Sequence, residues 1–197
     1  MEATGDMGKV IADQSISLDG FTTGLNVSVA NPLGDDGERL HQWMNSNPTN
    51  VTVSGEPFQT AGAFIVGRRM FDVGVGPWGD DPPFHAPVFV VTHRTHERLS
   101  KAGGTTYHFA TGGLDDALAR ARAAAGQRDV IVFGGANTIG QLLEARLLDE
   151  LRIHLLPVLL GNGTRLFEGA KLAPTELVRT RVVTAPDVTH FTFRVPR

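Results

Sequence analysis

Short apolar runs alternate with amphipathic stretches along most of the chain. β-branched or continuously apolar runs predict strands at residues 9–17, 63–66, 88–92, 105–109 and 129–133. Helical spacing is clearest over residues 114–125, where Leu114, Leu118 and Ala121 share one face and Gly126 follows as a stop. Similar spacing predicts helices at residues 38–45, 68–73 and 137–144.

The remaining segments are irregular or belong to the C-terminal part of a sheet. Residues 24–37 and 74–87 are rich in Gly, Pro, Asn or Asp and predict loops, and the polar, poorly periodic residues 46–60 predict a flexible excursion. A strand is expected at residues 151–160, and residues 176–184 and 188–195 flank a turn and predict a hairpin. The pattern predicts one α/β domain over residues 1–197, with three layers: a central, mostly parallel mixed sheet flanked by helices, and a C-terminal antiparallel hairpin.

Composition removes several classes of function. The 197 residues include no cysteine, which excludes disulfides and thiolate metal sites, and the only close histidine pair, His93 and His96, does not predict a metal site. With 18 basic and 21 acidic residues, the net charge of −3 does not favour nucleic-acid binding. The apolar runs are shorter than the ~20 residues that span a bilayer, and the N-terminus lacks a secretion signal, so we expect a cytoplasmic protein with no membrane contact.

The strongest local signal for a ligand site is a strand that ends in two glycines and continues as a helix. Residues 130–133 are apolar, Gly134 and Gly135 follow, and a helix is expected from Asn137. Glycines allow close approach of a ligand, and the first turn of a helix offers free amide groups to an anion such as a pyrophosphate. The alternative is a tight turn between strand and helix with no ligand.

Two further strand ends carry groups that bind phosphate. Gly67 is followed by Arg68 and Arg69, and the strand at residues 88–92 ends in Thr92-His93-Arg94. Guanidinium groups match the shape of phosphate, and ligands of open α/β sheets bind at the carboxyl edge of the strands. Each segment alone could be a solvated surface, but together they favour a dinucleotide, and the basic groups favour NADPH over NADH.

Four motifs occur in an order typical of one superfamily. They are Ser-Leu-Asp-Gly at residues 17–20, Phe-Ile-Val-Gly-Arg-Arg-Met-Phe at 64–71, Val-Ile-Val-Phe-Gly-Gly-Ala-Asn at 130–137, and the segment 148–161. In these motifs the chain resembles the dihydrofolate-reductase-like superfamily. It is most similar to the C-terminal reductase domain of bacterial riboflavin-biosynthesis deaminase/reductases and to their stand-alone relatives. The resemblance implies NADPH-dependent reduction of pteridine, pyrimidine or related rings.

The resemblance also implies roles for individual residues. The adenosine 2′-phosphate end of the cofactor would be held by Gly67, Arg68, Arg69, Thr92, His93 and Arg94. The pyrophosphate would be held by Gly134, Gly135, Ala136, Asn137, Thr138 and Ile139, with a cis peptide between the two glycines. The nicotinamide would be flanked by Ser15, Ser17, Asp19 and Gly20. The substrate pocket would be lined by Trp43, Trp78, Phe84 and His85. Asp19 and His41 are candidates for delivering the proton, with a bound water as the alternative, and Asp19 could instead be a turn residue.

Two positions depart from the family patterns. Dihydrofolate reductases have an acidic residue on their first helix, and residues 41–44 offer none; riboflavin-pathway reductases have a lysine where this chain has Asp13. We expect an NADPH-dependent oxidoreductase that transfers a hydride to a small pyrimidine- or pterin-like substrate, including a 5-amino-6-(5-phosphoribosylamino)uracil reductase-like activity. The alternatives are an NADPH-binding module without turnover, dihydrofolate reductase activity, or a structural dimer built by the C-terminal hairpin; a homodimer is expected in any case.

Overall fold

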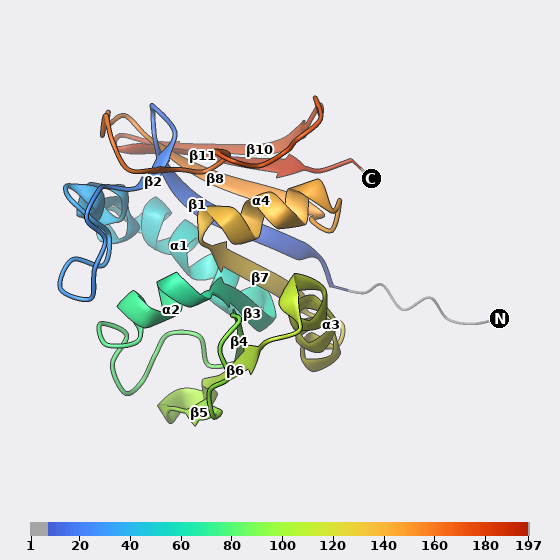
Figure 1. The fold of residues 1–197 in the computed structure, drawn as a ribbon. Coiled ribbons are helices and arrows are strands. Elements are labelled where there is room, and N and C mark those ends of the chain that lie inside the picture. The colour runs from blue at the N-terminus through green and yellow to red at the C-terminus, as the bar shows by residue number, and fades with distance from the viewer. Residues whose placement is uncertain (1–7, 197) are drawn as a thin grey trace.

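A central sheet with helices on both faces organises the molecule (Figure 1). The computed structural model describes residues 8–196. Within them, nine strands form one sheet in the order β10-β11-β8-β1-β7-β3-β4-β6-β5, and β2 (Phe21–Thr23) pairs with β9 (Thr164–Arg165) beside it. The strands of the large sheet are β1 (Val10–Ser17), β3 (Ala61–Gly67), β4 (Pro87–Val91), β5 (Leu99–Ser100), β6 (Thr106–Ala110), β7 (Asp129–Gly134), β8 (Glu150–Leu156), β10 (Val178–Ala185) and β11 (Val188–Arg194).

The pairing of the strands confirms the predicted fold class. The central strands β8, β1, β7, β3, β4 and β6 are parallel to one another, and the short β5 pairs antiparallel with β6. The C-terminal hairpin of β10 and β11 joins the sheet antiparallel to β8. Parallel strands need crossover connections, and a sheet covered on both faces needs apolar side chains on both, which explains the uninterrupted apolar runs of the sequence.

Four α-helices cover the two faces of the sheet within the described residues. Helices α1 (Pro48–Thr60) and α2 (Arg68–Gly74) pack on one face, and α3 (Gly113–Ala125) and α4 (Ala136–Glu144) on the other (Figure 1). Because side chains alternate along a strand, Ile11 belongs to the core under α1 and α2, whereas Ala12 belongs to the core under α3 and α4. In the described part of the chain, none of the helices has the length and apolar character needed to cross a membrane.

The prediction of a flexible excursion at residues 46–60 is wrong, because this segment contains α1. Asn47 caps the helix by accepting a hydrogen bond from the backbone N–H of Asn50, and Pro48 occupies the first turn. The buried positions of α1 are Asn50, Val53 and Pro57, which have helical spacing. Since one of them is polar and another is proline, the apolar periodicity that identifies a helix is absent from the sequence.

Two other boundaries differ from the prediction. Residues 38–45 form two short 3₁₀ helices, η1 (Gly37–Leu40) and η2 (Gln42–Asn45), because the backbone of His41 between them is not helical. Strand β8 ends at Leu156, and the chain then turns, with the N–H of Val158 bonded to the carbonyl of Leu156. The predicted strand therefore ends four residues early, and the freed segment lies against the Ser17–Gly20 turn.

Candidate functional site

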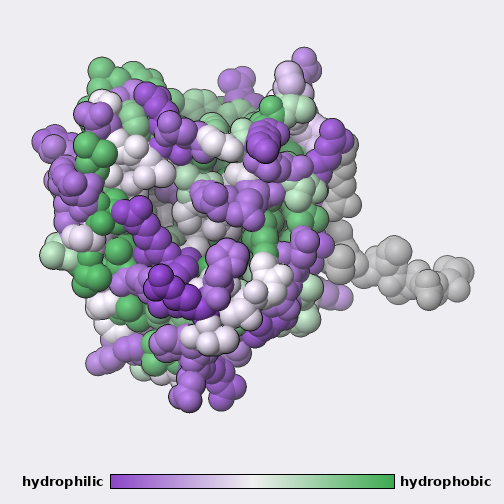
Figure 2. Space-filling model, viewed as in Figure 1, coloured by the Kyte–Doolittle hydropathy of each residue, from purple (hydrophilic) through white to green (hydrophobic). Residues whose placement is uncertain are grey.

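A cleft of about 1130 Å³ opens at the carboxyl ends of the central parallel strands. Strands β3 and β7 are neighbours, but their connections leave in opposite directions, to β4 and to β8. In open α/β sheets such a divergence creates the crevice in which ligands bind. On the face drawn in Figure 2, a recess is visible near α2 and α4, bordered by both hydrophilic and apolar residues.

The three strand ends selected from the sequence meet in this cleft. Its walls include Gly67 to Arg69 after β3, Thr92 to Arg94 after β4, and Gly135 to Thr138 after β7. The close approach of β3 and α4 depends on Gly67, since a Cβ there would lie 3.1 Å from Thr138 Oγ1. Segments far apart in the sequence thus contribute to one binding surface.

The N-terminus of α4 forms an open cradle on the cleft wall. The Gly134–Gly135 peptide bond is cis, as the resemblance implies, and Gly134 has a φ of 99°, which favours glycine. In the described part of the chain, no side chain caps α4, and a Cβ on Gly135 would meet no atom within 4 Å. The first N–H groups of a helix have no intrahelical acceptor, so this end presents free donors to an anion. The cradle fits a pyrophosphate.

The arginines of the cleft differ in whether their charge is already neutralised. Arg68 Nε donates to Asp72 Oδ1 at 2.7 Å, and its guanidinium lies over the ring of Phe71. Arg69 Nη2 donates to the carbonyl of Val27 at 3.3 Å. Among residues 8–196, neither Arg69 nor Arg94 pairs with a carboxylate. These two arginines are therefore the better candidates for holding a phosphate monoester.

The opposite part of the cleft is apolar and aromatic. Phe58 of α1 and Phe133 of β7 have ring centroids 5.4 Å apart, and Trp78 meets Phe84 edge-on at 5.0 Å. All four side chains line the cleft, together with Met44. Flat aromatic walls suit a planar ring, and their burial keeps water away from it. Trp78 and Phe84 therefore lie where the sequence placed them.

Two residues predicted for the substrate pocket lie elsewhere. Trp43 is only 1% exposed, and its indole Nε1 donates to Ser15 Oγ at 3.0 Å, so it belongs to the core beneath the cleft. His85 is exposed outside the cleft, with its Nε2 3.3 Å from Asp81 Oδ1. The sequence located both aromatic rings near the cleft but could not show which way each side chain points.

Asp19 fastens two loops together and does not line the cleft. Its carboxylate accepts hydrogen bonds from Ser17 Oγ at 2.6 Å and from the backbone N–H groups of Gly161 at 2.8 Å and Leu160 at 3.1 Å. The Ser17 hydroxyl first, and then these amides, lower the pKa of Asp19 to about 2. Asp19 is thus ionised, and both of its carboxylate oxygens accept hydrogen bonds, which fits the alternative prediction of a turn residue. It is unsuited to donating a proton. Four other predicted cofactor residues also lie outside the cleft wall: Ser17, Gly20, Gly134 and Ile139.

Replacing Asp19 by asparagine should destabilise the protein in a pH-dependent way. Because the pKa is lowered from 3.8 to about 2 on folding, the carboxylate contributes stability above pH 3.8, and this contribution is lost as the pH falls to about 2. The urea midpoint of Asp19→Asn should therefore lie below that of the wild type near neutral pH and approach it in acid. Glu176→Gln, at an exposed position, is the control. If the urea midpoint of Asp19→Asn lies equally far below that of the wild type at both pH values, the assignment is contradicted.

His41 lies in the cleft wall but is a neutral imidazole at neutral pH. Burial, and secondarily the charge of a protonated His154, lower the pKa of His41 to about 4. Its Nδ1 is buried and has no hydrogen-bond partner among the described residues. A neutral ring can orient a ligand through this open position, but it holds no excess proton to give away.

Several cleft residues were not found from the sequence. Asp13 lines the cleft next to the predicted Ser15, and the strand alternation that places Ile11 in the core under α1 also places Asp13 and Ser15 on that face. This alternation is the sequence pattern from which Asp13 could have been predicted. The loop after β2 has no such pattern, because its residues are brought to the cleft only by tertiary contacts. The cleft residues of β2, of the loop after it and of the start of α3 are Thr22, Thr23, Val27, Asn31, Pro32, Leu33, Gly113 and Leu114.

Comparisons with known proteins give a consistent result. A model of the family described as the RibD C-terminal domain matches residues 8–190. A putative riboflavin biosynthesis protein from Shewanella sp. PV-4 superposes with a TM-score of 0.72 at 24% identity, covering 96% of this chain and 99% of that one. A diaminohydroxyphosphoribosylaminopyrimidine deaminase/5-amino-6-(5-phosphoribosylamino)uracil reductase from Thermotoga maritima superposes with a TM-score of 0.67 at 14% identity. The match covers 96% of this chain and 57% of that one. Dihydrofolate reductase from Enterococcus faecalis complexed with NADP(H) and RAB-propyl superposes with a TM-score of 0.62 at 15% identity. The match covers 97% of this chain and 98% of that one. The predicted dihydrofolate-reductase-like fold is confirmed.

Proposed function

Since the chain belongs to the RibD C-terminal domain family, we propose that it is a reductase that uses NADPH to reduce a small nitrogen heterocycle. The substrate is of the pyrimidine or pterin kind, including rings like those of riboflavin biosynthesis. The observation that carries this proposal is that three strand ends, which carry arginines or free amide groups suited to a phosphate, converge on one cleft whose other part is apolar and aromatic. One part fits the phosphates of a dinucleotide and the other fits a planar ring.

The described residues fit the cofactor on two independent grounds. The space in front of Gly135 is open and faces the uncapped start of α4, as a pyrophosphate requires. Arg69 and Arg94 lie in the same cleft and pair with no carboxylate among the described residues, as a 2′-phosphate requires. When bound, NADPH would supply a hydride, which carries both electrons of the reduction.

The chain's own residues bind, orient and shield the reacting groups. Arg69, Arg94 and the α4 amides fix the phosphate end, so that the nicotinamide end extends toward β1. There Gln14 and Ser15 line the cleft, and Ser15 is buried with its hydroxyl accepting from Trp43. The aromatic wall around Phe58 positions the substrate ring and excludes water, which would otherwise compete for the reactive centre.

Calorimetric titration with NADPH, NADH and FMN tests the cofactor assignment. We expect saturable binding of NADPH, about tenfold or more tighter than NADH because of the charge-assisted bonds to the 2′-phosphate, and weaker binding of FMN. No heat with NADPH, or equal affinity for NADPH and NADH, would contradict it. Loss of NADPH absorbance with pteridines, flavins and diaminopyrimidines then separates a reductase from a module that only binds.

A further inference from the structure

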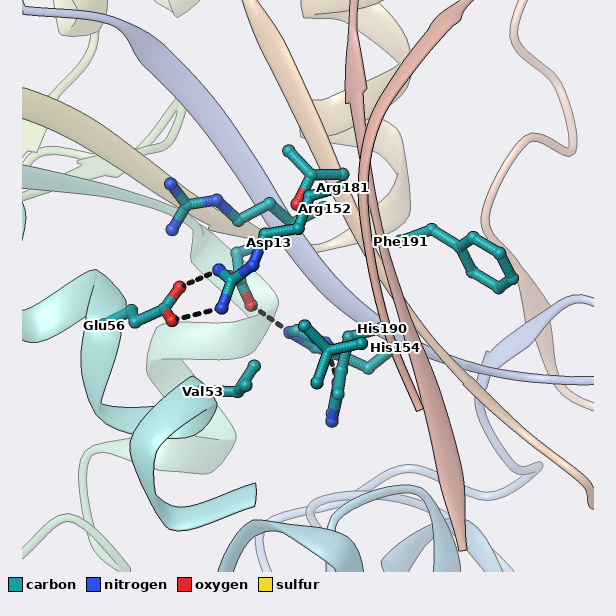
Figure 3. Close-up of a pocket in the computed structure, with 10 residues that line it drawn as sticks. Asp13, Val53, Glu56, Arg152, His154, Arg181, His190 and Phe191 are labelled. Carbon is teal, nitrogen blue, oxygen red and sulfur yellow. Dashed lines mark hydrogen bonds and ion pairs between the residues drawn. The ribbon is translucent and has the colours of Figure 1, made fainter. Parts of the chain in front are cut away.

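A chain of buried polar side chains leads from the cleft toward the β10–β11 turn. Asp13 Oδ1 lies 2.9 Å from His154 Nε2, and His154 Nδ1 lies 2.8 Å from His190 Nδ1 (Figure 3). His190 Nε2 lies 2.9 Å from Asn50 Oδ1, and Asn50 Nδ2 lies 3.0 Å from Asp187 Oδ1. Asp13, His154, His190 and Asn50 are at most 8% exposed. Burial of four polar groups in one row is costly unless every contact is a satisfied hydrogen bond.

The direction of each hydrogen bond follows from the exposed end of the row. Hydrogen bonds from Ser46 first, then from the backbone N–H of Asp187 and from Asn50, lower the pKa of Asp187, so this carboxylate is ionised and only accepts. Asn50 must therefore donate through Nδ2 and accept through Oδ1, which requires a proton on His190 Nε2. Burial, followed by the charge of His154, lowers the pKa of His190 to about 4, so the ring is neutral and its Nδ1 is a bare acceptor. His154 must then donate through Nδ1.

The remaining contact, between His154 Nε2 and Asp13 Oδ1, holds one proton. With no proton, two lone pairs would face each other at 2.9 Å, and with two protons, two donors would clash. The proton lies either on the imidazole, giving an ion pair, or on the carboxyl, giving two neutral groups. In both cases the pair is neutral overall and carries one transferable proton.

Asp13 connects this pair to the cleft. It lines the cleft wall, and its Oδ2 is buried without a hydrogen-bond partner among the described residues. It also borders a small cavity of about 10 Å³ beneath α1, drawn in Figure 3, which has room for about one water. The other carboxylates of the cleft differ: Glu38 is exposed, and Asp72 is paired with Arg68.

The elements that pack around the Asp13–His154 pair carry other charged groups, and these groups form ion pairs with one another. Arg181 of β10 makes a two-point ion pair with Glu56 of α1, at 2.7 and 2.8 Å, as Figure 3 shows. Arg152 of β8 donates to Glu150 at 2.8 Å. Arg181 is thus paired with Glu56, and Arg152 shares Glu150 with Lys9. The hydrogen-bond partner of Asp13 is His154. The titratable or charged groups facing the pair are Arg152, Arg181, Glu56, Glu150, His41, His190 and Asp187.

We propose that the Asp13–His154 pair is the acid that protonates the substrate. This role rests on the proposed function. As a hydride adds to the carbon of a ring C=N bond, the proton of the pair passes through Asp13 to the nitrogen, so that C=N becomes CH–NH and NADPH becomes NADP⁺. Transfer leaves a carboxylate facing the lone pair of a neutral imidazole, and because this contact is repulsive the pair takes a proton back from solvent. The substrate class is a ring imine whose nitrogen faces Asp13.

The proton count can be tested without any substrate. Long-range ¹H–¹⁵N NMR of the full chain at neutral pH should show His190 protonated at Nε2 only and His154 protonated at Nδ1. Asp13→Asn provides the matched comparison, because its amide can donate to His154 Nε2 and keep the row hydrogen-bonded. A charged His190, or a proton on His190 Nδ1, would overturn the assignment.

Turnover tests the role of the pair as the acid. For the first ring of the panel that the wild type reduces, Asp13→Asn should lower kcat by roughly 10²–10⁴-fold, the usual contribution of a general acid, with NADPH affinity unchanged. His154→Gln should also lower kcat, because a glutamine side chain holds no acidic proton that it could share with Asp13. Glu176→Gln, at an exposed position outside the cleft, is the control and should keep the wild-type kcat and pH profile.

The outcomes separate this inference from the proposed function. If NADPH binds and a ring is reduced, but Asp13→Asn keeps the wild-type kcat and pH profile, the pair is not the acid and the reductase proposal stands. If the wild type neither binds NADPH nor reduces any ring, the proposed function fails and the catalytic role of the pair fails with it.

Discussion

Removing Arg69 and Arg94 together is expected to weaken NADPH binding by roughly 10²–10⁴-fold. Each guanidinium is expected to make a charge-assisted hydrogen bond to the 2′-phosphate, worth about 1.5–3 kcal/mol, or roughly 10–100-fold in the dissociation constant. NADH lacks the 2′-phosphate, so its affinity should change by about threefold at most. The double variant Arg69→Ala/Arg94→Ala is measured by calorimetric titration with both cofactors.

The structure also orders the effects of the individual arginines. Arg68 is held by Asp72 at 2.7 Å, so Arg68→Ala should lower NADPH affinity less than Arg94→Ala. Arg179→Ala is the control, because Arg179 is exposed on β10 outside the cleft and its replacement removes the same charge. Equal losses for NADPH and NADH in the double variant would remove the 2′-phosphate assignment and leave only a general effect of charge.

Replacing Asn50 by leucine is expected to destabilise the protein by about 3–5 kcal/mol, since breaking a buried polar network leaves its other members unsatisfied. Asn50 is 0% exposed and bonds to Ser46, Asp187 and His190. Leucine has similar volume but leaves the N–H of His190 without an acceptor and removes one of the hydrogen bonds to Asp187. The free energy of unfolding in urea measures the loss.

The comparison on the same helix is Gln59→Leu, at an exposed position near the end of α1. We expect it to change the free energy of unfolding by about 0.5 kcal/mol or less, as surface substitutions usually do. If Asn50→Leu is as stable as the wild type, the buried row is not maintained by its hydrogen bonds, and the proton count derived for the Asp13–His154 pair loses its basis.

The cofactor end of the cleft could be predicted from sequence because each of its parts is local. A strand, a glycine and the residues that follow lie within a few positions of each other, as in Gly67-Arg68-Arg69 or Gly134-Gly135-Ala136. Parallel strands then bring their carboxyl ends to one edge whatever the loops between them do. The positions of Arg68, Thr92 and Asn137 in one cleft follow from this rule.

The substrate end depends on tertiary contacts that no local pattern contains. Helix α1 has Asn50 and Pro57 at buried positions, so its periodicity is hidden, and with it the place of Phe58 on the cleft wall. Trp43 and His85 were expected in the pocket, but the direction of a side chain in a short 3₁₀ helix or a loop is set by its tertiary partners, here Ser15 and Asp81. The Asp13–His154 contact joins residues 141 positions apart.

We propose that one NADPH molecule lies across the ends of β3, β4 and β7, and a crystal structure of the complex with NADPH would decide this. We expect the 2′-phosphate between the guanidinium groups of Arg69 and Arg94, the pyrophosphate against Gly135 and the start of α4, and the nicotinamide beside Ser15. A cofactor bound on any other surface, or phosphates that touch neither arginine, would contradict it.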